Sequence, residues 1–282
     1  MPGINRVKTW LLIGSLAALF VAVGAVIGGG RGATIALVIA FLFNGIMYWS
    51  SDRIAIAATK SKPVSREEAP ELYAIVEELA MEARAPMPRI YVSEMAQPNA
   101  FATGRSPERA AVSVTRGILG ILDRRELRGV LAHELSHVLN RDILVSSIAG
   151  AIASAFTYLA YMVFFVGGDD DSPLSGIGFI LLWLVGPLAA GMIQMAVSRS
   201  REYQADESGA VLSQDPEALA SALLKLEQAS RVVPAQLNPA QAHMFIVNPL
   251  RGRRGGGITS LFSTHPPTEE RVRRLRDLVS RI

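Results

Sequence analysis

The sequence predicts an α+β integral membrane protein that is mainly helical, with four transmembrane helices and a cytoplasmic part that contains a small β-sheet. Three observations lead to this fold class. The chain has 282 residues, 50% of them hydrophobic, and its mean hydropathy is +0.30, whereas soluble proteins of this length usually have a negative value. Four long runs contain no Lys, Arg, Asp or Glu, and short β-like runs occur in the polar part between them.

Each apolar run is long enough to form one membrane-spanning helix. About 17–25 helical residues are needed to cross the roughly 30 Å of hydrocarbon in a bilayer. GGGRG separates the first two runs, and a segment containing GGDDDS separates the last two, so the sequence predicts two helical hairpins. The runs are residues 10–27, 33–49, 143–166 and 176–197.

The first run has a second interpretation. Arg6 and Lys8, an apolar core and the small residues AVGA also describe a cleaved signal peptide. We favour an uncleaved anchor, because another apolar run follows at once. Burial of the runs in a soluble core is a weaker alternative, since the last two runs are long and free of charge.

The basic residues predict the orientation. Positive residues near span ends mark the cytoplasmic side. The two short connections on the opposite side contain one Arg31 and three aspartates. Both termini and segments 51–142 and 198–282 are therefore expected in the cytoplasm, around hairpins at 1–50 and 143–197. The cytoplasmic basic residues near the spans are Arg6, Lys8, Arg53, Lys60, Lys62, Arg66, Arg141, Arg199 and Arg201.

The polar segments contain recognisable starts of helices and strands. Ser65–Glu68 and Asp123–Glu126 have the form of capping boxes, and Asp215-Pro216 and Pro267 also introduce helical patterns. Residues 232–263 are rich in Pro and Gly and predict a mobile loop. The expected strands are 89–94, 99–104 and 110–115, and the expected helices are 65–83, 123 through the third apolar run, the fourth run through 212, 216–229, and 267 onward.

The motif His133-Glu134-Leu-Ser-His137 predicts a metal site. Positions four apart are separated by about 400° of helical rotation, so both imidazoles project from one face and can bind one zinc ion. Glu134 lies about 100° away, where it can reach a water on the metal and act as the general base of hydrolysis. The motif arising by chance in a helix is the weaker alternative. The absence of cysteine excludes thiolate ligands, thiol nucleophiles and disulfides, and a formal charge of +3 gives no reason to expect nucleic acid.

Two histidines leave zinc short of a ligand, and we predict Glu202 as the third. If the helices continue into the adjacent spans, His137 lies about 9 Å from one membrane-embedded run and Glu202 about 7.5 Å from its hairpin partner. Two antiparallel helices then bring them to the same depth. Glu207 fits this depth less well and Asp206 falls between, while His243 and His265 are the remaining histidines.

HELSHVLNRD, a membrane hairpin and SRSREYQAD together resemble the HtpX family of membrane-embedded zinc endopeptidases, relatives of the membrane CAAX proteases. The resemblance extends over essentially the whole chain and includes NAFATG and STHPP. It implies a zincin-like gluzincin domain with two His and one Glu as ligands of one Zn²⁺. It also implies a multi-pass protein of the bacterial inner membrane in stress response and quality control, with damaged membrane proteins as substrates. Membrane proteases and chaperones are then candidate partners besides the bilayer.

The resemblance also suggests residues around the metal. Gluzincins often place an Asp four residues after the ligand Glu, which implies that Asp206 accepts a hydrogen bond from His133; an ordinary solvated aspartate is the alternative. Arg199 lies on the same helix face as Glu202, where it would stabilise the oxyanion, pair with Asp206 or simply reach the membrane interface. His265 is expected to form a structural turn, with oxyanion stabilisation as the alternative.

Asn99 and the strands around AAVSVT suggest an edge strand that pairs with an extended substrate, while a core strand is the alternative. His243 is expected to be structural or exposed. Two other functions remain open at this point: an inactive membrane scaffold that keeps the fold, and a transporter of four spans. Glu134 disfavours the first, and the scarcity of polar residues within the spans disfavours the second.

Overall fold

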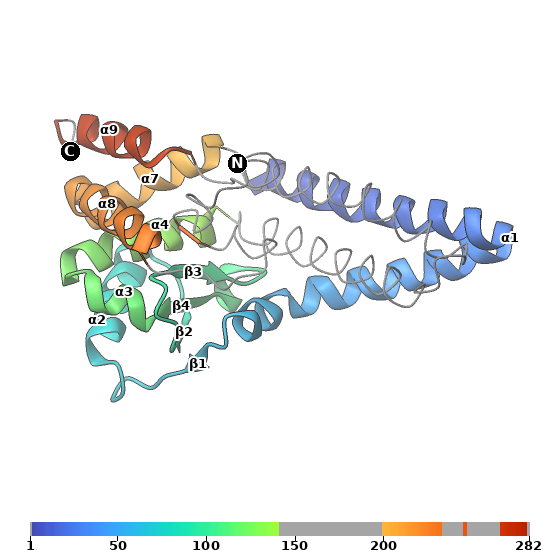
Figure 1. Cartoon of the computed structure of the whole chain (residues 1–282), viewed down its shortest axis with the longest axis horizontal. Coiled ribbons are helices and arrows are strands. Elements are labelled where there is room, and N and C mark those ends of the chain that lie inside the picture. The colour runs from blue at the N-terminus through green and yellow to red at the C-terminus, as the bar shows by residue number, and fades with distance from the viewer. Residues whose placement is uncertain (1, 141–198, 233–244, 247–265, 281–282) are drawn as a thin grey trace.

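The structure is a computed structural model of residues 1–282, and it describes residues 2–140, 199–232, 245–246 and 266–280. A long helical arm extends from a compact part, formed by the described residues after Ala58, which combines helices with one sheet (Figure 1). The predicted third and fourth spans, with His243 and His265, lie outside the described residues.

The arm is formed by α1, Pro2–Ala58. It reverses direction near Gly29, whose φ of 59° lies in the left-handed region that favours glycine, and its two legs diverge from that point in Figure 1. Over the residues that the structure describes, no helix combines the length and the apolar character needed to cross a membrane. The number of spans therefore stays a prediction.

One mixed sheet contains four strands: β1 Lys62–Pro63, β2 Arg89–Ser93, β3 Ala100–Thr103 and β4 Ala111–Thr115. Their order is β1-β2-β4-β3, with β2 and β4 parallel and the other two pairs antiparallel. The three strands expected from the sequence are present with slightly shorter bounds, and the short β1 was not predicted. Strand β3 lies at one edge of this sheet, so one side of its backbone is available for other partners.

Helix α2, Pro70–Glu82, begins later than the sequence predicts. The expected box at Ser65 does form, because Glu68 accepts from the Ser65 N–H at 2.7 Å and donates its own N–H to the Ser65 hydroxyl at 3.3 Å. This box, however, forms a turn that precedes the first residue of α2. Pro70 explains the difference, since proline suits the first helical position and disfavours a helical conformation at the residue before it.

Helix α4, Arg124–Leu139, contains the motif that predicts the metal site. The predicted capping box is present at its start: Asp123 accepts from the Glu126 N–H at 2.9 Å and Glu126 accepts from the Asp123 N–H at 3.0 Å. The helix ends at Leu139 with Asn140 in the cap position, where φ is −76° and ψ is −6°. The expected continuation of this helix into the third apolar run lies outside the described residues.

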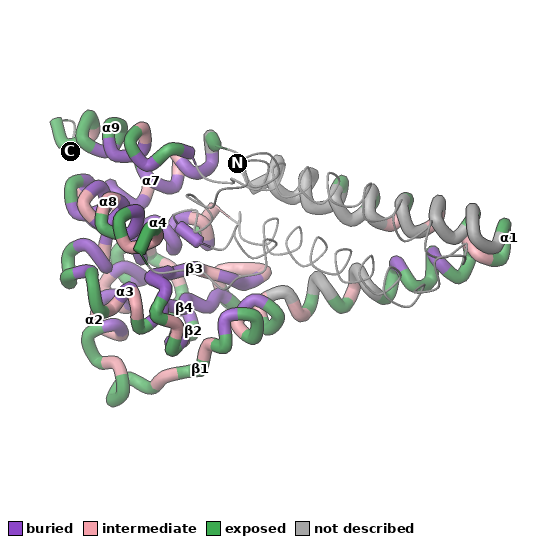
Figure 2. The backbone as a smooth tube through the Cα atoms, viewed as in Figure 1, coloured by how far each residue is buried: buried purple, intermediate pink, exposed green. Residues whose placement is uncertain are grey.

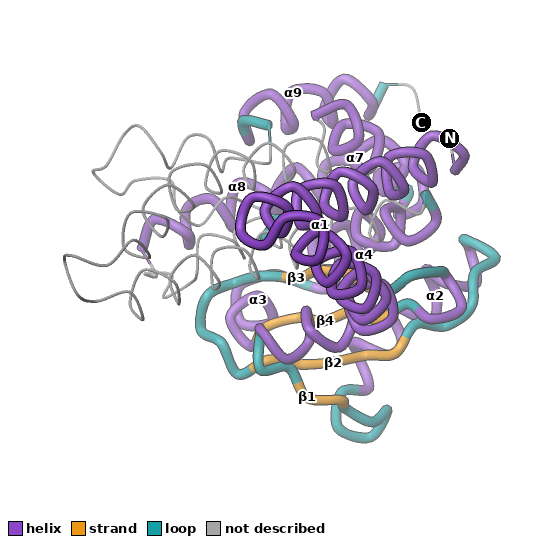
Figure 3. Tube along the Cα trace, turned by 90° about the vertical axis from the view of Figure 1, so that its right-hand side faces the viewer, coloured by secondary structure: helices purple, strands orange, loops and turns teal. Residues whose placement is uncertain are grey.

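Four further helices complete the described part: α3 Arg116–Ile121, α7 Arg199–Ser213, α8 Pro216–Val232 and α9 Thr268–Val279. A single turn of 3-10 helix, η1 Pro107–Arg109, connects β3 to β4. Figure 3 shows α4, α7, α8 and α9 on the β3 side of the sheet. The helices predicted at 216–229 and from 267 are thus present. The helix expected from the fourth apolar run through 212 is present over its described part, and α3 was not predicted.

One large hydrophobic core within the described residues joins these helices to the sheet. Ile75 of α2, Ile118 of α3, Leu131 of α4, Leu223 of α8 and Leu275 of α9 are all fully buried in it. Each such side chain contributes about 1.5–3 kcal/mol when it leaves water. Figure 2 shows buried residues along α4, α7 and α8, so the helix with the histidines lies inside the core. This burial holds α4 in a fixed position relative to α7.

Helices α4 and α7 approach most closely where Gly209 faces His133. A Cβ atom at Gly209 would lie 2.7 Å from both the backbone N and the Cα of His133. We therefore expect Gly209→Ala to push the helices apart, to lower the free energy of unfolding by about 1–3 kcal/mol, and to weaken metal binding at His133. Denaturant unfolding and zinc titration would measure both effects.

Gly120→Ala in α3 is the matched control, because a Cβ there has nothing within 4 Å. Alanine also favours the helix over glycine, so this variant should be as stable as the wild type or slightly more stable. If Gly209→Ala has the same free energy of unfolding and the same zinc affinity as the control, the close contact does not constrain the site.

Candidate metal centre

Helix α4 supplies the first three side chains of the candidate centre. His133 is 1% exposed and Glu134 is 7% exposed, while His137 is less deeply buried. The two histidine rings are edge to face, with centroids 4.8 Å apart and planes at 90°. Their Nε2 atoms lie 3.3 Å from each other, so both point toward the same position.

Helix α7 brings Glu202 to the same position. Its Oε1 lies 3.6 Å from Nε2 of His137, and its Oε2 lies 3.9 Å from Nε2 of His133. One ligand atom from each of these three residues falls within 4.8 Å of the others. Glu202 is itself buried, at 3% exposure. The structure thus brings together the three residues that the sequence predicts as metal ligands.

The spacing of these atoms fits a tetrahedral ion. Two nitrogen atoms that each bind zinc at about 2.0–2.1 Å in tetrahedral geometry lie roughly 3.4 Å apart. The observed Nε2–Nε2 distance is 3.3 Å, and the closer carboxylate distance is 3.6 Å. A donor set of two imidazoles and one carboxylate also matches the ligands that catalytic zinc sites use. The residues therefore fit one zinc ion.

Glu134 is held in place by the edge strand. Its Oε2 accepts a hydrogen bond from the backbone N–H of Ala102 in β3 at 3.0 Å. That hydrogen bond fixes the position of the Glu134 carboxylate. It also connects Glu134 to the side of β3 that faces away from β4. Sequence reasoning missed Ala102, because no side chain takes part in this contact.

Asp206 lies one helical turn after Glu202 and contacts the other side of His133. Its Oδ1 is 3.0 Å from His133 Nδ1, although the N–H direction is not well aligned for a hydrogen bond. A carboxylate at this nitrogen favours the tautomer with the proton on Nδ1, which leaves Nε2 free to bind metal. The predicted partnership of Asp206 with His133 therefore has the required distance.

Arg271 of α9 is the arginine that pairs with Asp206. Its Nε donates to Oδ2 at 2.8 Å and its Nη2 donates to Oδ1 at 2.6 Å, so the pair is bidentate. Both side chains are buried, Arg271 at 1% and Asp206 at 3% exposure. Such charge-assisted double contacts define orientation more strictly than a single hydrogen bond does.

The charges of this buried pair shift both pKa values. Burial by itself would raise the pKa of Asp206, but the charge and hydrogen bonds of Arg271, with a smaller contribution from His133, lower it below its usual value. Burial would likewise lower the pKa of Arg271, while Asp206, Glu202 and Glu134 raise it. Both groups therefore remain charged.

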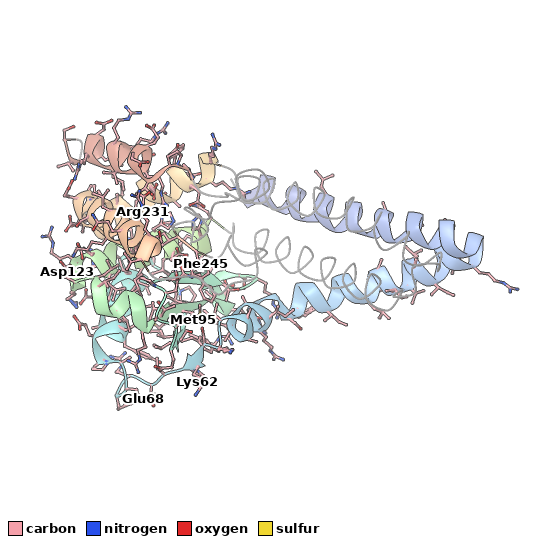
Figure 4. All side chains as sticks on the ribbon, in the orientation of Figure 1. Lys62, Glu68, Met95, Asp123, Arg231 and Phe245 are labelled. Atoms are coloured by element: carbon pink, nitrogen blue, oxygen red, sulfur yellow. The ribbon has the colours of Figure 1, made fainter. Side chains whose placement is uncertain are left out.

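A third contact connects the pair to the edge strand. The Nη1 of Arg271 donates to the backbone oxygen of Ile246 at 3.0 Å, and the Ile246 N–H donates to Oδ1 of Asn99 at 3.3 Å. Figure 4 labels the neighbouring Phe245 within the compact part of the molecule. Asn99, which immediately precedes β3, is thus linked to the metal centre through backbone atoms that a sequence motif could not reveal.

The structure also corrects one alternative for Arg199. Arg199 is exposed at the start of α7, and within the described residues Asp206 forms its ion pair with Arg271 instead. The sequence did contain a signal for Arg271. It lies on the same helical stripe as Val272, Leu275 and Leu278, and an arginine on an apolar stripe needs a buried partner.

The predicted edge strand lies at NAFATG and not at AAVSVT. Strand β4, which contains AAVSVT, has a neighbour on both sides, whereas β3 is the edge of the described sheet. Thr115 donates its backbone N–H to the Asn99 oxygen at 2.9 Å. By antiparallel alternation, Phe101 and Thr103 then also face β4, while the backbone groups of Ala100 and Ala102 face the metal side.

Comparisons with known proteins show similar chains over nearly the whole length. A family model described as Peptidase family M48 matches residues 66–279. A Protease HtpX homolog from Pelotomaculum thermopropionicum is 50% identical over 278 residues, which cover 96% of this chain and 98% of the relative. Another Protease HtpX homolog, from a Sulfurihydrogenibium species, is 51% identical over 291 residues, which cover 99% of this chain and 97% of the relative.

One solved structure has a fold similar to that of this chain. The crystal structure of S. mikatae Ste24p is similar to this chain with a TM-score of 0.55 and 20% sequence identity, over 96% of this chain and 65% of that one. At this identity the likeness shows the fold alone. The family model and the near full-length relatives establish more: the chain belongs to peptidase family M48, in its HtpX group, and is a metalloprotease.

Proposed function

We propose that this protein is a zinc-dependent endopeptidase of the membrane, which hydrolyses misfolded or damaged membrane proteins at the cytoplasmic face. The observation that carries the proposal is the cluster of His133, His137 and Glu202, whose ligand atoms lie within 4.8 Å of one another. Glu134, on the same helix, supplies a carboxylate for proton transfer.

Each residue of the site has a separate role. His133, His137 and Glu202 hold the zinc ion. When bound, zinc polarises the scissile carbonyl and lowers the pKa of a water molecule toward about 7. Glu134 takes a proton from that water and later passes it to the leaving amine. Ala102 keeps the carboxylate of Glu134 in position through its N–H at 3.0 Å.

The edge of the sheet is suited to an extended substrate. On the metal side of β3 the Ala102 N–H already donates to Glu134 and Ala100 is fully buried, so the backbone oxygen of the partly exposed Ala102 is the group that faces a substrate. A peptide that pairs with this strand would receive main-chain hydrogen bonds and run past Glu134. Such pairing requires an unfolded stretch of substrate, which agrees with damaged proteins as the substrate class. Membrane-protein substrates, a role in stress response, and protease or chaperone partners rest on the family resemblance.

The membrane location rests on the apolar runs and on the exposed side chains of α1. A helix whose large apolar residues face outward is suited to lipid. The basic residues near the predicted spans favour a cytoplasmic active site in the bacterial inner membrane. The most exposed apolar residues of this helix are Leu11, Ile35, Leu37, Val38, Phe41, Leu42, Ile46 and Trp49.

Metal removal tests the zinc proposal. We expect a chelator to abolish cleavage of a denatured protein by the detergent-solubilised wild type, and added zinc to restore it. Glu202→Ala should weaken zinc binding by more than the roughly 10–100-fold that loss of an outer-shell partner causes, because it removes a direct ligand. Zinc titration against a competing chelator measures the affinity.

Glu207→Ala is the matched control for the ligand assignment. Glu207 lies on the same helix, was the alternative carboxylate, and is exposed. This variant should bind zinc like the wild type. If Glu202→Ala binds zinc as tightly as Glu207→Ala, the third ligand is misassigned; if chelation leaves cleavage unchanged, the proposed zinc dependence fails.

A further inference from the structure

Most arginines of the compact part are neutralised by a nearby acidic side chain. Arg66, Arg89 and Arg128, for example, pair with Glu77, Asp52 and Glu82 at 2.9, 2.8 and 2.7 Å. Arg53 and Arg105, like Arg84, Arg109 and Arg199, have no ion pair with an acidic residue of the described part of the chain. Arg53 and Arg105 are distinguished by their place, where α1 contacts the end of β3. Unpaired arginines in adjacent elements suggest an anionic partner from outside the chain.

Arg105 is nevertheless held in one place. Its guanidinium lies 3.9 Å from the centre of the Trp49 ring, and Trp49 is 63% exposed. This stacking orients the planar group and leaves the N–H donors at its rim available, which suits the tetrahedral oxygens of a phosphate. Arg53 lies one helical turn after Trp49, so a second guanidinium projects from the same face of α1.

The three residues lie where the exposed surface of α1 changes character. Phe41 and Ile46, 79% and 58% exposed, precede Trp49. Charged residues begin at Asp52 and Arg53. An exposed tryptophan between apolar and basic residues is typical of the boundary between hydrocarbon and headgroups. Figure 1 shows this end of α1 beside the sheet.

Two contacts fix this boundary relative to the metal centre. Asp52 pairs with Arg89 of β2 at 2.8 Å, which ties α1 to the sheet. Arg105 follows β3 after Gly104, whose φ of 134° and close approach to Arg109, 2.6 Å for an added Cβ, leave room only for glycine. A ligand on Arg105 would therefore anchor the strand that holds Glu134.

We propose that Trp49, Arg53 and Arg105 form a site for the phosphate of an anionic phospholipid in the cytoplasmic leaflet. The proposal rests on the membrane location proposed above. The indole lies at the level of the headgroups, and the two guanidinium groups bind one phosphate. The bound lipid holds the edge strand β3 at the membrane surface, where an unfolded segment of a membrane protein first becomes accessible.

The test compares lipid selectivity in reconstituted full-length protein. Wild type is placed in phosphatidylcholine nanodiscs that contain trace spin-labelled phosphatidylglycerol or spin-labelled phosphatidylcholine, and the motionally restricted fraction of each is measured. We expect the wild type to favour phosphatidylglycerol. Arg53→Gln and Arg105→Gln should each reduce this preference about fivefold, as expected for loss of one basic group at an anionic surface.

Two further variants test whether the lipid preference depends on the planar guanidinium and on the location of the charge. Arg105→Lys keeps the charge but loses the planar stack, so it should retain only part of the preference. Arg125→Gln is the charge-matched control, because Arg125 pairs with Asp215 at 2.6 Å and follows Asp123, which Figure 4 shows at the end of the molecule opposite α1. The proposal is overturned if wild type shows no preference for phosphatidylglycerol, or if Arg125→Gln reduces it as much as Arg105→Gln.

The same samples separate this proposal from the proposed function. Wild type that does not enter nanodiscs would contradict the membrane location. Wild type that enters them and cleaves a denatured protein, yet shows equal restriction of both labelled lipids, would overturn only the headgroup site. Arg105→Gln that keeps zinc and folded structure but loses lipid preference would support it.

Discussion

Glu134→Gln is expected to reduce the rate of peptide hydrolysis by about 10²–10⁴-fold while zinc stays bound, because loss of a general base costs about this much. Glutamine is nearly the same size, and its side-chain oxygen can still accept the Ala102 N–H that Glu134 accepts at 3.0 Å. It cannot take a proton from water. The measurement is kcat on a denatured protein substrate, together with zinc content per chain.

Glu71→Gln is the matched control for that variant. Glu71 is exposed in the first turn of α2, and the same substitution there should leave both kcat and zinc content unchanged. Equal cleavage by Glu134→Gln and wild type would rule out the assigned proton transfer. Loss of zinc from Glu134→Gln would instead show that this residue has a structural role in the centre.

Arg271→Met is expected to lower the free energy of unfolding by about 3–5 kcal/mol, the usual effect of removing one partner from a buried ion pair. The cause is Asp206, which remains 3% exposed and loses both hydrogen bonds from Arg271. Denaturant unfolding measures the change. Arg273→Met is the control on the same helix; it pairs with Glu270 on the surface, where such a pair contributes about 0–1 kcal/mol.

The double variant Asp206→Asn, Arg271→Met separates stability from positioning. Removing both charges should recover part of the stability lost in Arg271→Met, because no unpaired charge stays buried. Zinc affinity should remain about 10–100-fold below wild type, because His133 still lacks the carboxylate that orients it. Wild-type zinc affinity in the double variant would mean that Asp206 has no part in orienting His133.

Local sequence patterns predicted much of the fold. The box at Asp123–Glu126 specified the start of α4, and Asp215-Pro216 specified the start of α8, where Asp215 accepts the Ala218 N–H at 3.0 Å. These signals succeed because the atoms involved are within a few residues of each other. The box at Ser65 formed without starting the helix, since Pro70 restricts the residue before it.

The sequence predicted which residues of the candidate centre lie close together, but not that they bind a metal. The spacing of His133 and His137 follows from the geometry of one helix, and Glu202 follows from the proximity of two helices; the structure brings their ligand atoms within 4.8 Å. Their binding of a metal stays a prediction, as does the number of membrane spans. The helix through HELSH is present in α4, which ends at Leu139, and its expected continuation into the third apolar run lies outside the described residues.

The sequence by itself identified the residues that we propose as metal ligands and general base. The two histidines could be paired because a helix places residues four apart on one face whatever surrounds it. Only the tertiary structure decided what holds them. Arg271 reaches Asp206 across 65 positions of chain, and Ala102 reaches Glu134 across 32. The first contact depends on how α9 packs and the second on where an edge strand lies, and no local pattern specifies either.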